Sequence, residues 1–370
     1  MMNKSILILV VCSLTIFSIG LLMVFNITSA EVLNRSLDVD TRFALFKQLS
    51  YGLIGIGIGF FVWYVGYQKI IEMSPYFLMT VIFFLMLVFI PKIGITLNGA
   101  KRWIGFAGFT IQPSEFAKFT IPIYFIQQIT KNKRHLDLNS FLKIITLFAL
   151  PLGLILIEPD TGTTIIIIAT LVVLFFLTKV KLLYWALPLL LITGSGTIVA
   201  YNMSHVQSRI KIYLHPELDL KGKGHQPYQA KIAVGSGKIF GRGLGESLQK
   251  LDYLPEARSD YIAAIYAEEL GFIGMVILIS LYMCIAYAGF LIAVKAKDKK
   301  GFYLAGIITF LISFQAFLNL GVVSGLLPSK GVTLPFFSQG GTSLIVNFIA
   351  IFLLLSVAKN TKLKKGLKKR

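Results

Sequence analysis

Long uninterrupted runs of apolar residues are the feature that most limits how this chain can fold. The first run extends from Ser5 to Ile27, and similar runs recur along the 370 residues. A helix needs roughly 20 apolar residues to cross the hydrocarbon core of a bilayer. The runs therefore predict an all-α integral membrane protein of about ten transmembrane helices, forming a single domain over residues 1–370. The expected spans are roughly 5–27, 48–67, 73–91, 115–130, 140–157, 162–178, 183–201, 261–294, 302–324 and 342–358.

The basic residues between the runs indicate which helix ends face the cytoplasm. An even number of spans places both termini on one side. That side would carry 19 of the 36 Lys and Arg residues but only three of the 17 Asp and Glu residues. Because cytoplasmic loops are enriched in Lys and Arg, both termini, including a basic tail at 359–370, are expected in the cytoplasm. This topology also explains the formal charge of +19, so no nucleic-acid partner is expected.

The connections expected on the outer face are longer than those on the cytoplasmic face. The largest is an extracytoplasmic loop at 202–260, between the seventh and eighth helices. Loops longer than about 15 residues are usually functional or disordered. This loop mixes glycines, aromatic residues and charges, so much of it is expected to be ordered. A second outer loop covers 92–114. The stretch 325–341, interrupted by Pro and Gly, should line a cavity or be buried in protein.

Five clusters of polar residues lie on the outer side of this topology. Charges near a bilayer centre cost about 2.5–3.5 kcal/mol each, so they need partners or a function. In the first cluster, Glu115 and Lys118 share a helix face, which suits a structural ion pair and substrate binding equally well. Arg102 and Trp103 precede them, either as binding residues or as anchors of the loop at the membrane surface.

The second cluster is the turn at residues 158–162. Its proline and glycine favour a turn. Capping of the next helix is the simpler role for Asp160, whereas Glu158 has no comparable role. The third cluster is the glycine-rich segment Gly235–Gly245. It lacks the Gly-Lys-Ser/Thr ending of a phosphate-binding P-loop, and loop flexibility would explain its glycines.

Carboxylates flank the entrance of the eighth helix in the fourth cluster. Glu256 and Asp260 lie on either side of Arg258. A carboxylate at such an entrance is suited to act as a general base, and capping of the helix by Ser259 or Asp260 is the alternative. Glu268 follows about two turns beyond Asp260, on nearly the same face.

The fifth cluster places Lys330 within the stretch 325–341. A lysine beside free backbone N–H groups could bind an anion. Together, the five clusters predict a polar site at the outer leaflet for an anionic, lipid-linked substrate.

The same stretches, in the same order, resemble the SEDS family of peptidoglycan polymerases, the FtsW, RodA and SpoVE group. The resemblance extends over essentially the whole chain. Lys101 and Lys330 are more similar to the division member FtsW than to the elongation member RodA. Ser259, Tyr261 and Gln339 stand where the family usually has Thr, Phe and Tyr. The matching stretches are Asn98-Gly-Ala-Lys-Arg-Trp-Ile104, Gln112-Pro-Ser-Glu115, Glu158-Pro-Asp-Thr-Gly162, Leu254-Pro-Glu-Ala-Arg-Ser-Asp260, Glu268-Glu-Leu-Gly271, Leu327-Pro-Ser-Lys-Gly331 and Gly340-Gly-Thr-Ser343.

The resemblance implies an inverting glycosyltransferase that polymerises lipid II at the outer face of the bacterial inner membrane during cell division. It implies that Asp260 is the catalytic base. Arg102, Lys118 and Lys330 would bind the donor pyrophosphate, and neighbouring carboxylates would orient them or hold a divalent cation, the only cofactor expected. The substrate-binding residues implied are Arg102, Trp103, Glu115, Lys118, Asp160, Glu256 and Lys330.

The resemblance also implies partners and leaves alternatives. A class B penicillin-binding protein would be the transpeptidase partner, alongside other membrane proteins of the division machinery. The alternatives are an elongation polymerase similar to RodA, a non-catalytic scaffold for the transpeptidase, and a lipid II flippase. The flippase is motivated by the charges at Glu115, Lys118, Glu268 and Glu269. However, a flippase needs a polar path to the cytoplasmic face, whereas the clusters lie on one side.

Overall fold

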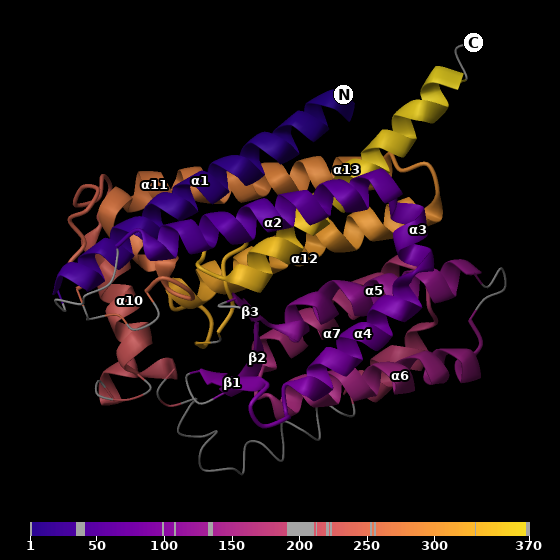
Figure 1. Ribbon diagram of the computed structural model, residues 1–370, viewed down its shortest axis with the longest axis horizontal. Helices are drawn as coiled ribbons and strands as arrows, with labels where there is room; N and C mark the ends of the chain where they lie inside the picture. Colours follow the sequence, from indigo (N-terminus) through magenta and orange to yellow (C-terminus); the bar gives the residue numbers. More distant parts are fainter. Residues whose placement is uncertain are drawn as a thin grey trace.

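Long apolar helices make up most of the computed structural model (Figure 1). It describes residues 2–34, 41–97, 100–106, 109–131, 136–190, 211, 213–219, 222, 224–251, 254, 257–329 and 331–367. The helices are α1 (Met2–Asn34), α2 (Phe43–Val65), α3 (Tyr67–Glu72), α4 (Ser74–Leu87), α5 (Pro113–Lys131), α6 (Leu138–Ile157), α7 (Thr161–Leu177), α10 (His225–Ser236), α11 (Ile262–Val294), α12 (Lys299–Val323) and α13 (Gly341–Leu367). Residues 182–190 are also helical, and Pro216–Asp219 form a short 3-10 helix, η1.

The helices match the expected spans in position. In the described part of the chain, six helices are long and apolar enough to cross a membrane, namely α1, α2, α6, α11, α12 and α13. Helices α4 and α7 are shorter but also apolar. The seventh expected span, 183–201, is described only as far as residue 190, so the total of ten stays a prediction. The start of α1 and the end of α13 point away from α10, which comes from the large loop and lies at the opposite end of the bundle (Figure 1).

Helices α12 and α13 form the interior of the bundle. Their apolar stretches are 67% and 72% buried, against 28% for α2 and α6, which direct most of their apolar side chains outward. Small residues allow α2 to approach α13 closely, as is common where membrane helices pack. A Cβ on Gly55 would lie 2.9 Å from Ile345 Cα, and one on Gly59 would lie 2.3 Å from the Phe352 ring.

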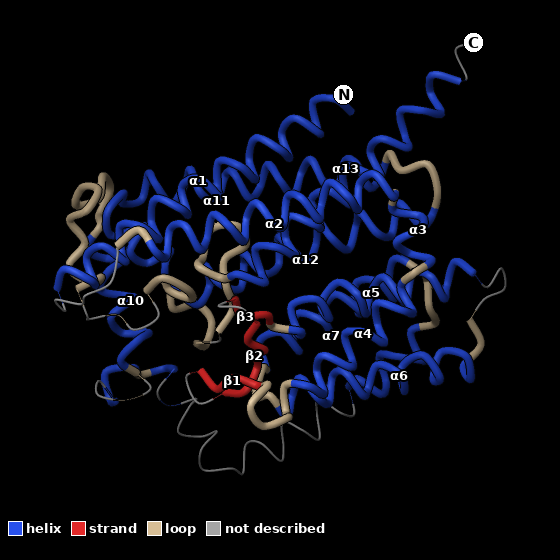
Figure 2. Tube along the Cα trace, viewed as in Figure 1, coloured by secondary structure: helices blue, strands red, loops and turns tan. Residues whose placement is uncertain are grey.

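A small antiparallel sheet occupies the outer loop expected at 92–114 (Figure 2). Its strands are β1 (Gly94–Leu97), β2 (Ala100–Phe106) and β3 (Phe109–Ile111), in the order β1–β2–β3. The all-α prediction is therefore incomplete. Strands of only three to seven residues carry no clear two-residue hydrophobic period, which is the signal that would reveal them. The Tyr51 hydroxyl of α2 accepts from Thr110 N at 2.9 Å and holds the sheet against the bundle.

The glycine-rich segment Gly235–Gly245 packs against a break in α11. Gly271 has φ 66° and ψ −162°, which interrupts the helix there. Near the break, Arg242 N donates to the Glu268 carbonyl at 3.0 Å. A Cβ on Gly271 would lie 2.3 Å from Gly241 N. Gly241 and Gly271 therefore allow close backbone packing, whereas the Cβ positions of Gly235 and Gly245 have no atom within 4 Å, and the expected flexibility of the segment stays a prediction.

Candidate functional site

A cavity of about 560 Å³ lies between the sheet, α5, α12 and the segment 331–343. It brings together residues from the first, fourth and fifth polar clusters, from Ala100 to Ser343. Two predicted site residues, Glu256 and Lys330, lie outside the described residues. The predicted site residues that line the cavity are Arg102, Trp103, Glu115, Lys118 and Asp260.

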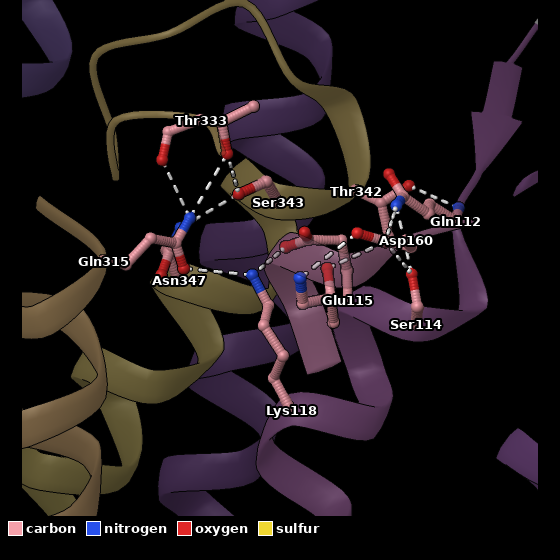
Figure 3. Close-up of polar contacts among 11 residues, drawn as sticks. Gln112, Ser114, Glu115, Lys118, Asp160, Gln315, Thr333, Thr342, Ser343 and Asn347 are labelled. Carbon is pink, nitrogen blue, oxygen red and sulfur yellow. Dashed lines mark hydrogen bonds and ion pairs between the residues drawn. The ribbon is translucent and has the colours of Figure 1, made fainter. Parts of the chain in front are cut away.

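Helix α5 supplies a buried ion pair to the cavity wall (Figure 3). Lys118 Nζ lies 2.8 Å from Glu115 Oε2, and the side chains are 2% and 9% exposed. The same ammonium donates to Gln315 Oε1 of α12 at 3.0 Å. The contact with Gln315 is a hydrogen bond, whereas the contact with Glu115 is an ion pair. The structural ion pair expected from the sequence is confirmed, and the pair also lines the cavity.

Amides on α12 were missed by the sequence reasoning. Gln315 Nε2 donates to Thr333 O at 2.9 Å, and Thr333 Oγ1 lies 3.0 Å from Ser343 Oγ (Figure 3). Asn319 follows one turn later and is 1% exposed. Two amides four residues apart in an apolar helix are a signal that could have identified this face, because polar groups inside a membrane span need partners.

Asp160 caps α7 and connects that helix with the start of α5. Its Oδ1 accepts from Thr163 N at 3.1 Å, which confirms the capping role. Its Oδ2 accepts from Gln112 Nε2 at 3.2 Å and from Ser114 Oγ at 3.3 Å (Figure 3). Asp160 is 2% exposed and lies behind the cavity wall, where it orients Gln112, a lining residue.

Arg102 joins strand β2 to the turn between α6 and α7. Its Nε donates to the Glu158 carbonyl at 3.0 Å, and its Nη2 donates to the Pro159 carbonyl at 2.6 Å. The Glu158 side chain is buried, and neither carboxyl oxygen has a hydrogen-bond partner among the described residues. Burial raises the pKa of Glu158 to about 8; the nearby Asp160 charge adds to this rise and Arg102 opposes it.

Asp260 lies directly before α11 and faces the segment 331–343 across the cavity. Tyr261, not Asp260 or Ser259, occupies the N-cap position, and its side chain makes no capping hydrogen bond. The N-cap expected at Ser259 or Asp260 therefore lies further along the chain, at Tyr261. A Cβ on Gly331 would lie 3.1 Å from Asp260 Oδ2, so this wall passes close to the carboxylate.

Glu268 and Glu269 turn away from the cavity and attach the large loop to the bundle. Ser247 Oγ donates to Glu268 Oε2 at 2.5 Å. Lys250 Nζ lies 2.9 Å from Glu269 Oε1, and Asn26 of α1 donates to Glu269 Oε2 at 2.6 Å. Both carboxylates therefore have partners within the described residues, and the flippase alternative stays a prediction.

The cavity wall combines two cations, Arg102 and Lys118, with two carboxylates, of which Glu115 is paired with Lys118 and Asp260 lies before α11. Arg102 and Lys118 could neutralise an anionic group, while Asp260 could accept a proton from a hydroxyl near that group. Among the residues described, no group of three His, Cys, Asp or Glu side chains is placed to hold a metal ion.

Comparisons with known proteins agree on one family. Its model, FTSW_RODA_SPOVE, described as a cell cycle protein, matches residues 6–363. A probable peptidoglycan glycosyltransferase FtsW of Trichlorobacter lovleyi is 36% identical over 367 residues, 97% of this chain and 93% of the relative. Stage V sporulation protein E of Bacillus subtilis is 35% identical over 359 residues, 96% of this chain and 97% of the relative.

A solved structure shares the fold. It is a chain in a peptidoglycan synthase complex that coordinates polymerization and crosslinking. Its TM-score is 0.75 at 22% identity, and the match covers 95% of this chain and 97% of that one. At this identity the likeness establishes the arrangement of the helices.

Proposed function

The chain belongs to the FtsW, RodA and SpoVE family, and we propose that it is a peptidoglycan glycosyltransferase that polymerises lipid II into glycan strands. One observation carries the proposal: Asp260, Arg102 and Lys118 line the same cavity of about 560 Å³. Related FtsW proteins that are similar over nearly their whole length are named as probable peptidoglycan glycosyltransferases, which supports the same reaction here.

The reaction needs a base on one substrate and positive charge on the other. The 4-hydroxyl of the acceptor sugar attacks C1 of the donor, and the bond from C1 to the polyprenyl pyrophosphate breaks with inversion. The pyrophosphate leaves with the bonding electron pair, and Asp260 takes the hydroxyl proton. General-base catalysis of this kind contributes about 10²–10⁴-fold. Arg102 and Lys118 stabilise the charge that develops on the leaving group.

The other site residues support Asp260, Arg102 and Lys118 or contact the substrate. Glu115 holds Lys118 through their 2.8 Å ion pair. Asp160 orients Gln112 of the cavity wall, to which it is hydrogen-bonded at 3.2 Å, and Trp103 packs against the bound sugars. Lys330 adds a further cation for the pyrophosphate, and Glu256 orients the cations; both roles rest on the family motifs.

The cellular setting follows from the family. The chain is a multi-pass protein of the bacterial inner membrane. We place both termini in the cytoplasm and the cavity at the outer leaflet. We also assign the chain to cell division, because relatives at 34–36% identity carry the name FtsW. A class B penicillin-binding protein is the transpeptidase partner that we expect, by analogy with the solved synthase complex.

Purified protein and labelled lipid II test the proposal directly. The wild type, with or without its transpeptidase, should make glycan polymer. Asp260→Asn, which removes the base and keeps the shape, should not. Glu246→Gln is a matched control, because Glu246 is an exposed carboxylate of the large loop outside the cavity lining. Thermal unfolding should show that both variants remain folded.

Three outcomes would contradict the assignment. Polymer made by Asp260→Asn at the wild-type rate would exclude Asp260 as the base. Translocation of lipid II in proteoliposomes without polymer would favour the flippase. Division supported in cells by Asp260→Asn would favour the scaffold.

A further inference from the structure

Asn319 of α12 connects two segments of the cavity wall. Its Nδ2 donates to the Asp260 carbonyl at 2.8 Å and to the Val332 carbonyl at 2.7 Å. Both amide hydrogens are therefore used by main-chain oxygens, one before α11 and one in the segment 331–343. Asn319 itself is 1% exposed and lies behind the cavity lining.

The carbonyl of Asp260 is the last of three consecutive carbonyls held in this way. Gln339 N donates to the Arg258 carbonyl at 2.9 Å. Ser338 Oγ donates to the Ser259 carbonyl at 2.6 Å. All three donors come from α12 or from the segment that follows it. Together these donors hold the main chain that carries Asp260, next to an N-cap residue, Tyr261, whose side chain makes no capping hydrogen bond.

Asn319 also sets the distance between the carboxylate and the opposite wall. Val332 follows Gly331, whose Cβ position would be 3.1 Å from Asp260 Oδ2. One amide on a buried membrane helix therefore fixes both sides of this close approach. The Asn319 Oδ1 atom has no hydrogen-bond partner among the described residues. Burying an unpartnered carbonyl oxygen costs free energy, so the two donated bonds must outweigh that cost.

We propose that Asn319 is a positioning residue. Through its two hydrogen bonds it holds the main chain of Asp260 at a fixed distance from the wall formed by Gly331 and Val332. The inference rests on the proposed polymerase function and adds a residue that does not touch the substrate. A displacement of about 1 Å at a reacting group can cost on the order of 100-fold in rate. A residue with this role should affect turnover more than substrate affinity.

The test measures polymerisation rates over a range of lipid II concentrations, for each variant after isolation of its folded fraction. Asn319→Leu keeps the side-chain size but removes both donors. We expect the rate at saturating lipid II to fall by about 10- to 100-fold. The half-saturating concentration should change by less than about threefold, because the cations that bind the substrate are unchanged.

Thr309→Val is the matched control in the same helix. Thr309 is fully buried, and its hydroxyl donates to Ala305 O of its own helix at 2.7 Å, away from both wall segments. This variant should keep the wild-type rate. Ser338→Ala is a second, smaller change, which removes the donor to the Ser259 carbonyl and also the acceptor of the Leu334 N–H at 2.8 Å. It should lower the saturated rate by about 3- to 10-fold, with no change in half-saturation.

The possible results separate the two proposals. Polymer from the wild type together with an unchanged saturated rate in folded Asn319→Leu would overturn the positioning role alone. If Asn319→Leu gives no folded protein, Ser338→Ala decides: a lower saturated rate supports the inference, and a wild-type rate refutes it. Absence of polymer from the wild type would refute the polymerase function, and the positioning role with it.

Discussion

Lys118 Nζ and Glu115 Oε2 lie 2.8 Å apart, one turn from each other on α5, with both side chains buried. A buried pair of this kind contributes little net stability compared with apolar residues of similar size, but loss of one partner leaves the other charge uncompensated. The pair therefore keeps a cation available in the cavity wall before any anionic substrate binds.

Replacing one partner of this ion pair should destabilise the fold more than replacing both partners together. Lys118→Met and Glu115→Gln should each lower the free energy of unfolding by about 3–5 kcal/mol, because each leaves one group without its partner. The double variant should lose less than the sum of these two effects. Denaturant unfolding in detergent measures all three. The exposed pair Lys300–Glu72, at 3.4 Å, is the control, and Lys300→Met should cost less than about 1 kcal/mol. Strictly additive losses at Lys118 and Glu115 would contradict the prediction.

Glu158 should make stability depend on pH. Burial raises its pKa to about 8 from a model-compound value of 4.5. Between these values the folded chain binds a proton that the unfolded chain releases, so this group's contribution is complete below pH 4.5 and falls as the pH rises towards 8. Glu158→Gln removes the titration. Its melting temperature should equal that of the wild type near pH 4.5 and exceed it increasingly up to about pH 8. The corresponding difference in the free energy of unfolding should be at most several kcal/mol.

A constant difference in melting temperature between Glu158→Gln and the wild type across this pH range would show that Glu158 does not titrate there. Glu246→Gln, at an exposed carboxylate, is the control and should leave the pH profile unchanged.

The break in α11 should tolerate no side chain. Gly271 has a positive φ, and its Cβ position lies 2.3 Å from Gly241 N. Gly271→Ala should therefore detach the glycine-rich segment, lower the melting temperature and expose residues 237–251 to protease. Gly235→Ala is the control, because its Cβ position has no atom within 4 Å. Within helix α10 this change should stabilise slightly, by about 0.5–1 kcal/mol. Equal protease sensitivity in the two variants would argue against close packing as the reason for glycine at 271.

The sequence contains most of the information about the helices and part of the information about the site. Hydrophobic length places the helices because each must satisfy its own backbone in lipid. The pairing of Glu115 with Lys118 was predictable because both lie on one helix. In contrast, the contact of Asn319 with Asp260 joins residues 59 positions apart and depends on how α12 packs, which no local pattern encodes. The roles of Gly241 and Gly271 were hidden for the same reason.

Arg102 should contribute to substrate affinity as well as to structure. Its guanidinium has five N–H donors, and the carbonyls of Glu158 and Pro159 accept from its Nε and Nη2 atoms. Donors remain for the cavity, which Arg102 lines. Arg102→Met should raise the half-saturating lipid II concentration about tenfold or more, and less so at high salt, because ions screen the attraction. Lys101→Met removes the same charge from an exposed neighbour outside the cavity lining, so it should leave half-saturation unchanged. If folded Arg102→Met shows wild-type half-saturation, the residue serves only to hold the sheet against the turn.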